Sequence, residues 1–192
     1  MLIFILIIYH IRDNNFLWAF FTSIMLLLTF IPGILRRYVP IDFPLLLDFF
    51  IALSFLFHIG NGLLHESSLI AIYNKFTHFF SAIVVAFLAL IVLYVIHEYE
   101  GDIVNNKKKV LFDIVIITIA LGVLWEFMEW STDALFGLGS QVDLDDTMFD
   151  LLADTLGGIC MSLIGYGLIK RDVLEKMGKN IKYQIDQRFT SE

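Results

Sequence analysis

The sequence has little cysteine, proline or charge: one cysteine, three prolines and 17% charged residues in a chain of 192. A single cysteine excludes a disulfide within the chain, and Cys160 lies in an apolar run, where it is interpreted as a small hydrophobic residue. The net charge of −7 and the lack of a basic patch predict no nucleic-acid partner. The apolar N-terminus, MLIFILII, lacks the positively charged region and cleavage site of a signal peptide.

Apolar residues are abundant instead. They make up 58% of the chain, and the mean hydropathy is +0.79. An ordinary soluble domain is about 45–50% apolar. The composition therefore predicts an integral membrane protein in contact with the lipid bilayer, and the length suits one compact bundle with little room for a soluble domain.

Five segments are long and apolar enough to cross a bilayer, which takes about 20 helical residues. These segments are residues 16–35, 45–64, 76–97, 110–130 and 149–169. Residues 1–11 reach only about 16 Å as a helix, so three interpretations are open: a surface helix, a short additional membrane segment, or the remnant of a span lost to a misplaced start codon. The predicted fold is an all-α integral membrane bundle of five transmembrane helices over residues 1–169, followed by a polar cytoplasmic tail over residues 170–192.

The positive charges predict an orientation, because Lys and Arg favour cytoplasmic loops. With the C-terminus inside, eleven of the thirteen Lys and Arg residues lie on the cytoplasmic side, while Arg12 and Lys75 lie outside. Trp18, Trp125 and Trp130 then fall at the outer boundary, where aromatic residues gather. The acids divide ten and ten, so the outer half carries 2 − 10 = −8 and the inner half 11 − 10 = +1. We predict a multi-pass protein of the prokaryotic plasma (inner) membrane, with the N-terminus outside.

Polar residues gather at the predicted outer ends of four spans. The stretch WEFMEWSTD places three carboxylates at positions i, i+3 and i+7 of one helical face. The chain has no Lys or Arg between Lys109 and Lys170, so acids held near the membrane there need a cation from elsewhere. The polar cluster consists of His58, Asn61, His65, Lys75, His78, Glu126, Glu129, Asp133, Asp150 and Asp154.

Imidazole and carboxylate ligands suit Zn²⁺, Mn²⁺ or iron. A divalent metal in this cluster would activate water to hydrolyse a phosphate or acyl bond of an envelope lipid or lipid-linked anion. The candidate metal ligands are His58, His65, His78, Glu126 and Asp154. The candidate catalytic residues are Glu126, Glu129, Asp150 and Asp154, and the candidate substrate-binding residues are Lys75 and Asn61. The sequence lacks an HExxH motif, a ferritin-like Glu-x-x-His pair and a Gly-x-Ser-x-Gly elbow, so enzymatic activity is left open.

Other interpretations of these residues are open as well. Asp133 and the loop acids are also typical of a solvated helix end, and His58 and Asn61 of hydrogen bonds between helices. The cluster also fits a small transporter, although that function needs a relay through the membrane or a homo-oligomer that lines a path. It fits a non-catalytic envelope protein whose acidic surface attracts cations. Small residues of the last span predict close helix packing: Gly157, Gly158, Ser162 and Gly165.

Three stretches occur in the order YNKFTHFF, WEFMEW and DDTMFDLLADTLGG. Together they resemble the YjdF-like family of small inner-membrane proteins of bacteria and archaea. More distantly they resemble VanZ-like proteins, which are associated with resistance to glycopeptide antibiotics. The resemblance covers residues 45–169 and implies a helical membrane fold but no particular reaction.

The resemblance can be followed residue by residue. Lys75 and His78 are similar to the family's basic residue and histidine at the start of a span. Glu126 begins a stretch that looks like its Trp-Glu-x-x-Glu helix end, and Asp150 ends one that looks like its Asp-Thr-x-x-Asp motif. The sequence departs from the VanZ-like pattern before the last helix, where acids replace an expected Arg, and at Asp154, where an Asn is usual.

Overall fold

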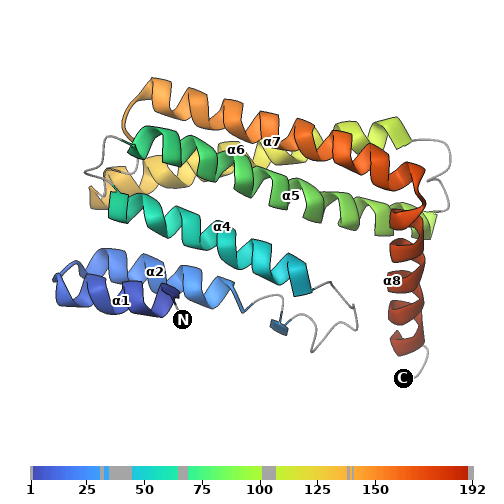
Figure 1. Cartoon of the computed structure of the whole chain (residues 1–192), viewed down its shortest axis with the longest axis horizontal. Coiled ribbons are helices and arrows are strands. Elements are labelled where there is room, and N and C mark those ends of the chain that lie inside the picture. The colour runs from blue at the N-terminus through green and yellow to red at the C-terminus, as the bar shows by residue number, and fades with distance from the viewer. Residues whose placement is uncertain are drawn as a thin grey trace. The chain divides into compact units, whose positions relative to one another are not determined.

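The computed structural model describes residues 2–30, 33–34, 45–64, 69–100, 107–137, 139 and 141–189. Every regular element within these residues is an α-helix, which confirms the all-α part of the predicted fold class (Figure 1). The chain divides into two compact units, Met1–Asn74 and Lys75–Glu192. The helices are α1 (Leu2–Arg12), α2 (Phe16–Leu28), α4 (Leu45–Leu64), α5 (Ile70–Glu100), α6 (Lys107–Phe136), α7 (Leu144–Lys170) and α8 (Val173–Phe189).

In the first unit, α1 and α2 form a tight helical hairpin. Asn14 adopts the left-handed backbone conformation in the turn, with φ of 58°. The side chain of Asn15 then caps α2 by accepting a hydrogen bond from the backbone N–H of Trp18 at 3.3 Å. His10 is buried in the hairpin and stacks on the indole of Trp18, with 6.1 Å between ring centroids. With 11 and 13 residues, the two helices reach only about 16 and 20 Å.

The continuous helix predicted over residues 16–35 is not observed, because α2 ends at Leu28 and Thr29 caps it. The Thr29 hydroxyl donates a hydrogen bond to the carbonyl oxygen of Leu26 at 2.6 Å, which competes with the helical hydrogen-bond pattern. The sequence places Pro32 three residues later, and proline cannot donate a backbone hydrogen bond. The segment predicted over residues 45–64 matches α4 at both ends.

The second unit contains the helices that can cross a membrane. Within the described residues, three helices are long and apolar enough to do so: Ile70–Ile96 of α5, all of α6 and all of α7. At 27 to 30 residues, they reach about 40–45 Å, against about 30 Å for a hydrocarbon core. Shorter apolar helices accompany these three. The described residues therefore show three candidate spans, and the predicted count of five is not confirmed.

Each predicted span of this unit is shorter than the helix that contains it. The predicted segments 76–97, 110–130 and 149–169 lie inside α5, α6 and α7. Polar residues explain why the helices are longer than the predicted spans. A span predicted from hydropathy stops at the first polar residues, whereas a helix can continue through polar residues at its ends. Lys107 begins α6 instead of closing a polar loop, and Asp143 caps α7 by accepting a hydrogen bond from the N–H of Asp146 at 2.8 Å. Acids in a first helical turn are further stabilised by the helix dipole.

The small residues of α7 allow close contact with both neighbouring helices. A Cβ atom added at Gly157 would lie 2.7 Å from the Cβ of Ala82 and 2.7 Å from the carbonyl oxygen of Phe79, so only glycine fits against α5. On the α6 side, the Ser162 hydroxyl donates a hydrogen bond to the carbonyl oxygen of Leu111 at 3.1 Å. The packing role predicted for the small residues is confirmed at both positions.

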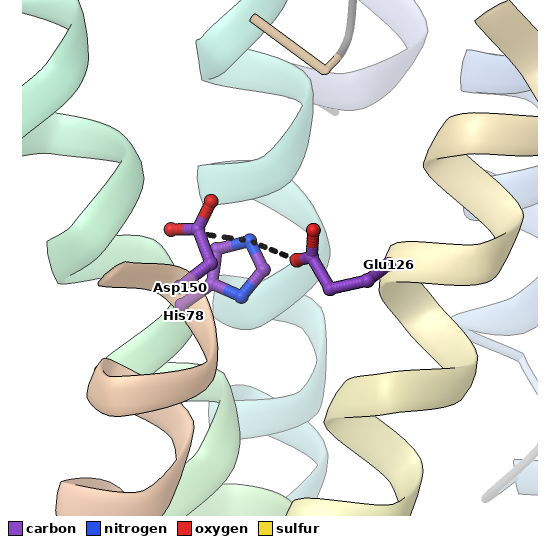
Figure 2. A group of neighbouring side chains, drawn as sticks. All are labelled: His78, Glu126 and Asp150. Carbon is purple, nitrogen blue, oxygen red and sulfur yellow. Dashed lines mark ion pairs between the residues drawn. The ribbon is translucent and has the colours of Figure 1, made fainter. Parts of the chain in front are cut away.

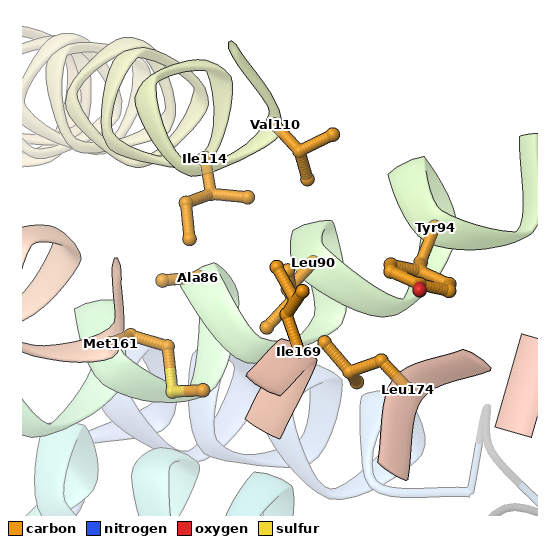
Figure 3. Close-up of a cluster of buried hydrophobic side chains, with 8 residues drawn as sticks. All are labelled: Ala86, Leu90, Tyr94, Val110, Ile114, Met161, Ile169 and Leu174. Carbon is orange, nitrogen blue, oxygen red and sulfur yellow. The ribbon is translucent and has the colours of Figure 1, made fainter. Parts of the chain in front are cut away.

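The apolar core of the second unit gathers near the end of α5 and the start of α6 (Figure 3). It draws on all four helices of the unit, so α8 is anchored to the bundle. Its buried members are Ala86, Leu90, Tyr94, Val110, Ile114, Met161, Ile169 and Leu174.

The polar tail predicted over residues 170–192 is largely the helix α8. Asp172 makes the turn into it with a left-handed backbone, at φ of 54°. Leu174, Gly178 and Ile181 recur at the spacing of one helical face, and all three are buried. In Figure 1, α8 runs across the direction of α5, α6 and α7. The charged residues of this predicted tail thus form the exposed side of an amphipathic helix.

Candidate functional site

Three helices of the second unit bring their ionisable residues together. Lys75 and His78 lie at i, i+3 on α5, and Asp150 and Asp154 lie at i, i+4 on α7, so each pair shares a helical face. Glu126 from α6 completes the group. Counted from the nearer helix ends, these residues lie about one and a half to three turns inside the bundle.

The imidazole of His78 lies between the carboxylates of Glu126 and Asp150 (Figure 2). Its Nε2 atom is 3.9 Å from Oε1 of Glu126 and 3.8 Å from Oδ1 of Asp150. The three side chains are buried, with 2%, 4% and 0% of their surface exposed. Oε1 of Glu126 accepts no hydrogen bond from any residue that the structure describes. A buried carboxylate oxygen in this condition needs a cation or a proton.

The other ring nitrogen of His78 faces Asp154. Its Nδ1 atom is 3.4 Å from Oδ1 and 3.5 Å from Oδ2 of that carboxylate. Asp154 thereby orients the ring so that Nε2 points toward Glu126 and Asp150. Room for this carboxylate comes from Gly122 on α6, because a Cβ atom added there would collide with Oδ2 of Asp154.

Lys75 supplies the cation nearest to the cluster. Its ammonium group forms ion pairs with the carboxylate of Asp146 and with Oδ1 of Asp150, the latter at 2.9 Å. It also donates a hydrogen bond to the backbone carbonyl of Asp146 at 3.1 Å. Lys75 is 24% exposed and Asp146 13%, whereas Asp150 is fully buried, so the ion pairs run from the rim of the site inward.

Two other predicted acids have local partners. Glu129 accepts a hydrogen bond from the indole N–H of Trp125 at 2.8 Å, one turn away on the same helix. Asp133 accepts a hydrogen bond from the backbone N–H of Gln141 at 2.7 Å and so shapes the connection between α6 and α7. The helix-end interpretation of Asp133 is therefore favoured, and neither acid belongs to the group of three possible metal ligands.

The residues predicted from the second span are not placed at this site. His58 lies on α4 in the first unit, and the two units are described separately. The side chain of Asn61 and the whole of His65 lie outside the described part of the chain. The described site therefore draws on three helices, where the sequence predicted four.

The sequence-based prediction missed two members of the site. The first is Asp146, the second partner of Lys75. Its i, i+4 spacing to Asp150 indicates that the two acids share a helical face. Gly122, which makes room for Asp154, lies four residues before Glu126 on the same face of α6, but an isolated glycine in an apolar run carries no chemical signal of its own.

The charges of the site do not balance. Five carboxylates lie on or beside it, from Glu126, Glu129, Asp146, Asp150 and Asp154, against one ammonium group from Lys75. With a neutral imidazole the sum is 1 − 5 = −4, and with a protonated one it is −3. Buried acids of this kind are stabilised by protons or by a bound cation.

Residues 1–171 match the family described as "Predicted membrane protein (DUF2238)". The chain is 29% identical over 113 residues to "Inner membrane protein YjdF" of Escherichia coli, and 30% identical over 95 residues to an "Uncharacterized protein" of Thermotoga maritima. These regions cover 50% and 49% of this chain and 52% and 47% of the relatives, so the chain spans about half the length of the curated relatives it matches. No solved structure matches it. The YjdF-like resemblance is confirmed, and the VanZ-like one stays a prediction.

Proposed function

We propose that this chain, which belongs to the DUF2238 family of predicted membrane proteins, binds a divalent metal ion through His78, Glu126 and Asp150 and acts on an anionic lipid or lipid-linked substrate. One observation carries the proposal. A nitrogen of His78 and one oxygen from each carboxylate lie within 4.8 Å of one another, in a buried position.

The two distances from His78 suit a metal after a small contraction. Bonds of about 2.1 Å in tetrahedral geometry separate neighbouring ligand atoms by about 3.4 Å. The distances from His78 Nε2 to the two carboxylate oxygens, 3.8 and 3.9 Å, exceed this by a few tenths of an ångström. Asp154 supports the same interpretation, because a carboxylate on the far ring nitrogen is the usual partner of a metal-binding histidine. Zn²⁺, Mn²⁺ and Fe²⁺ all accept such ligands.

Three protein ligands leave a coordination position for water or substrate, as in catalytic rather than structural sites. A bound metal would supply an activated water molecule at neutral pH. The protein's own groups would bind the substrate and transfer protons. Lys75, at the exposed rim, would hold an anionic group of the substrate, and Glu129, beside the three ligands, would exchange protons with the reacting groups.

Metal analysis of the detergent-purified protein tests the proposal. We expect about one equivalent of a divalent metal per chain in the wild type, prepared without chelators, and its loss in Glu126→Gln and in His78→Ala. Each substitution removes one of three ligands, and two ligands hold a metal poorly. Elemental analysis after size-exclusion chromatography gives the stoichiometry.

Asp133→Asn is the matched control, because Asp133 is on the same helix as Glu126, accepts a hydrogen bond from the backbone N–H of Gln141 and is not one of the three proposed ligands. It should retain the metal. A monodisperse elution profile shows that a variant is folded. A wild-type protein that takes up no metal even when Zn²⁺ or Mn²⁺ is added, or one whose metal survives both ligand substitutions, would contradict the proposal.

The orientation is part of the same proposal: the site faces the outside and α8 the cytoplasm of a plasma-membrane protein, supported by the excess of Lys and Arg toward the C-terminal side. Single cysteines at Val142 and Asn180, both exposed, report on it in a Cys160→Ala background. An impermeant thiol reagent on intact cells should label position 142 and spare position 180. Labelling of position 180 alone would mean that the orientation is inverted.

A further inference from the structure

A second charged surface lies at the opposite end of the helices from the metal-site residues. Sequence reading found no basic patch, because its residues come from segments some sixty positions apart. The structure gathers them where α6 begins and where α7 passes into α8. All are exposed, and we refer to them as the basic surface: Lys107, Lys108, Lys109, Lys170, Arg171, Lys176 and Lys179.

The helices that carry these residues are packed together. Leu174, in the first turn of α8, belongs to the same buried cluster as Val110, which follows the three lysines of α6. The next residue, Glu175, interacts with both sides: Lys179 donates a hydrogen bond to it at 2.6 Å, and Lys107 acts on it electrostatically. The hydrogen bond from Lys179, with the charges of Lys179 and Lys107, lowers the pKa of Glu175 below its ordinary value. The basic residues of α6 and α8 therefore act as one surface.

The balance of charge on this surface is positive. Among the side chains that the structure describes at this surface, seven are cationic and two are acidic, Asp172 and Glu175, so their sum is 7 − 2 = +5. This excess stands out in a chain whose net charge is −7. The surface is therefore suited to an anionic partner.

The position of the basic surface indicates which kind of anionic partner it can bind. α8 directly follows α7, a candidate membrane span, and runs across the direction of that helix (Figure 1). Its residues Leu174 and Ile181 are buried. Lys170, at the end of α7, holds its ammonium group 4.6 Å from the ring centroid of Tyr166, which is 47% exposed. Tyrosine and an extended lysine side chain are typical of the membrane boundary. These features are typical of a surface at the level of the lipid headgroups.

We propose that the basic surface binds the phosphodiester headgroups of anionic phospholipids in the adjoining leaflet. Basic clusters on an amphipathic helix next to a membrane span recognise such lipids by charge, over a distance of about 8–10 Å at physiological salt. Lys107, Lys108 and Lys109 and the lysines of α8 approach the same headgroups from two helices. This binding is independent of the metal site and of its proposed function.

The test uses the full chain in nanodiscs with equimolar phosphatidylglycerol and phosphatidylcholine, and compares the two lipids retained around the protein by mass spectrometry. The wild type should enrich phosphatidylglycerol severalfold. The triple variant Lys107→Gln, Lys108→Gln, Lys109→Gln should lose most of this enrichment, whereas the same three residues changed to Arg should keep it. High salt should reduce the enrichment in the wild type, which needs no variant to fold.

A second variant, Lys176→Gln with Lys179→Gln, probes the α8 side of the surface and should lower the enrichment as well. Equal amounts of the two lipids around the wild type would overturn the proposal, and so would enrichment that survives both sets of Gln substitutions. Binding of a single-stranded oligonucleotide by the wild type, with no preference between the lipids, would assign the surface to nucleic acid instead.

Discussion

Replacing Asp154 with Asn is expected to weaken binding of a divalent metal by about 10- to 100-fold, the usual cost of losing the carboxylate behind a metal-binding histidine. Asp154 faces Nδ1 of His78 at 3.4 Å and so directs Nε2 toward Glu126 and Asp150. An amide in its place has no negative charge to attract the imidazole N–H, and its NH₂ group can turn the ring to the wrong tautomer. The three direct ligands remain, so the effect is a loss of affinity rather than of the site.

Competition between Zn²⁺ and a metal-sensitive dye measures this affinity in detergent. The matched control is Asp145→Asn, which removes an acid from the same helix at an exposed position. It should leave the affinity close to that of the wild type. Equal affinities for Asp154→Asn and the wild type would mean that His78 needs no orientation by Asp154, and the assignment of ligand atoms would have to change.

Replacing Lys75 with Met is expected to act in opposite directions on the empty and the metal-bound protein. Without metal, the buried Asp150 loses the cation that lies 2.9 Å from its Oδ1 atom, which costs about 2 kcal/mol, between the values for a buried and an exposed pair, because Lys75 is partly exposed. With metal, the same substitution removes the ammonium group that competes with the metal ion for Oδ1 of Asp150. That oxygen is also the one that faces Nε2 of His78. Two unit charges about 4 Å apart near a protein surface repel by about 4 kcal/mol, so partial relief suffices for a gain of about tenfold in metal affinity.

Thermal unfolding with and without Zn²⁺ separates the two effects. Lys75→Met should unfold at a lower temperature than the wild type when empty and should gain more from saturating metal. Lys75→Arg keeps the positive charge and should behave like the wild type in both conditions. If metal shifts the unfolding temperature of Lys75→Met and of the wild type equally, Lys75 and the metal do not share Asp150.

The part of the site on α5, α6 and α7 was accessible from sequence because helical spacing fixes which side chains share a face. The i, i+3 spacing of Lys75 and His78, and the i, i+4 spacing of Asp150 and Asp154, put each pair on one face of a helix. The lack of Lys and Arg between Lys109 and Lys170 then indicated that the acids need a cation from another helix. The structure brings Lys75 and His78 to them.

Other parts could not be predicted, since they depend on distances between helices. Spacing alone does not show that Gly122 of α6 faces Asp154 of α7, or that Lys75 reaches Asp146. Hydropathy placed the helix ends too far inside, because it rejects charged residues such as Lys107 that a helix end accepts. It also hid α8, whose apolar residues form only one stripe.

The length of the three long helices has a consequence for the electrostatics of the site. Glu126 lies ten residues before the end of α6 at Phe136, about 15 Å, and Asp150 lies six residues after the start of α7, about 9 Å. If helices of about 40–45 Å extend equally beyond a hydrocarbon core of about 30 Å, Glu126 lies about 8 Å and Asp150 about 4 Å inside the edge of that core. The acyl-chain length of the lipids then decides how much water reaches Lys75, and with it how strongly the charges beneath attract a cation. Bilayer thickness thereby becomes a control on the site that involves none of its residues.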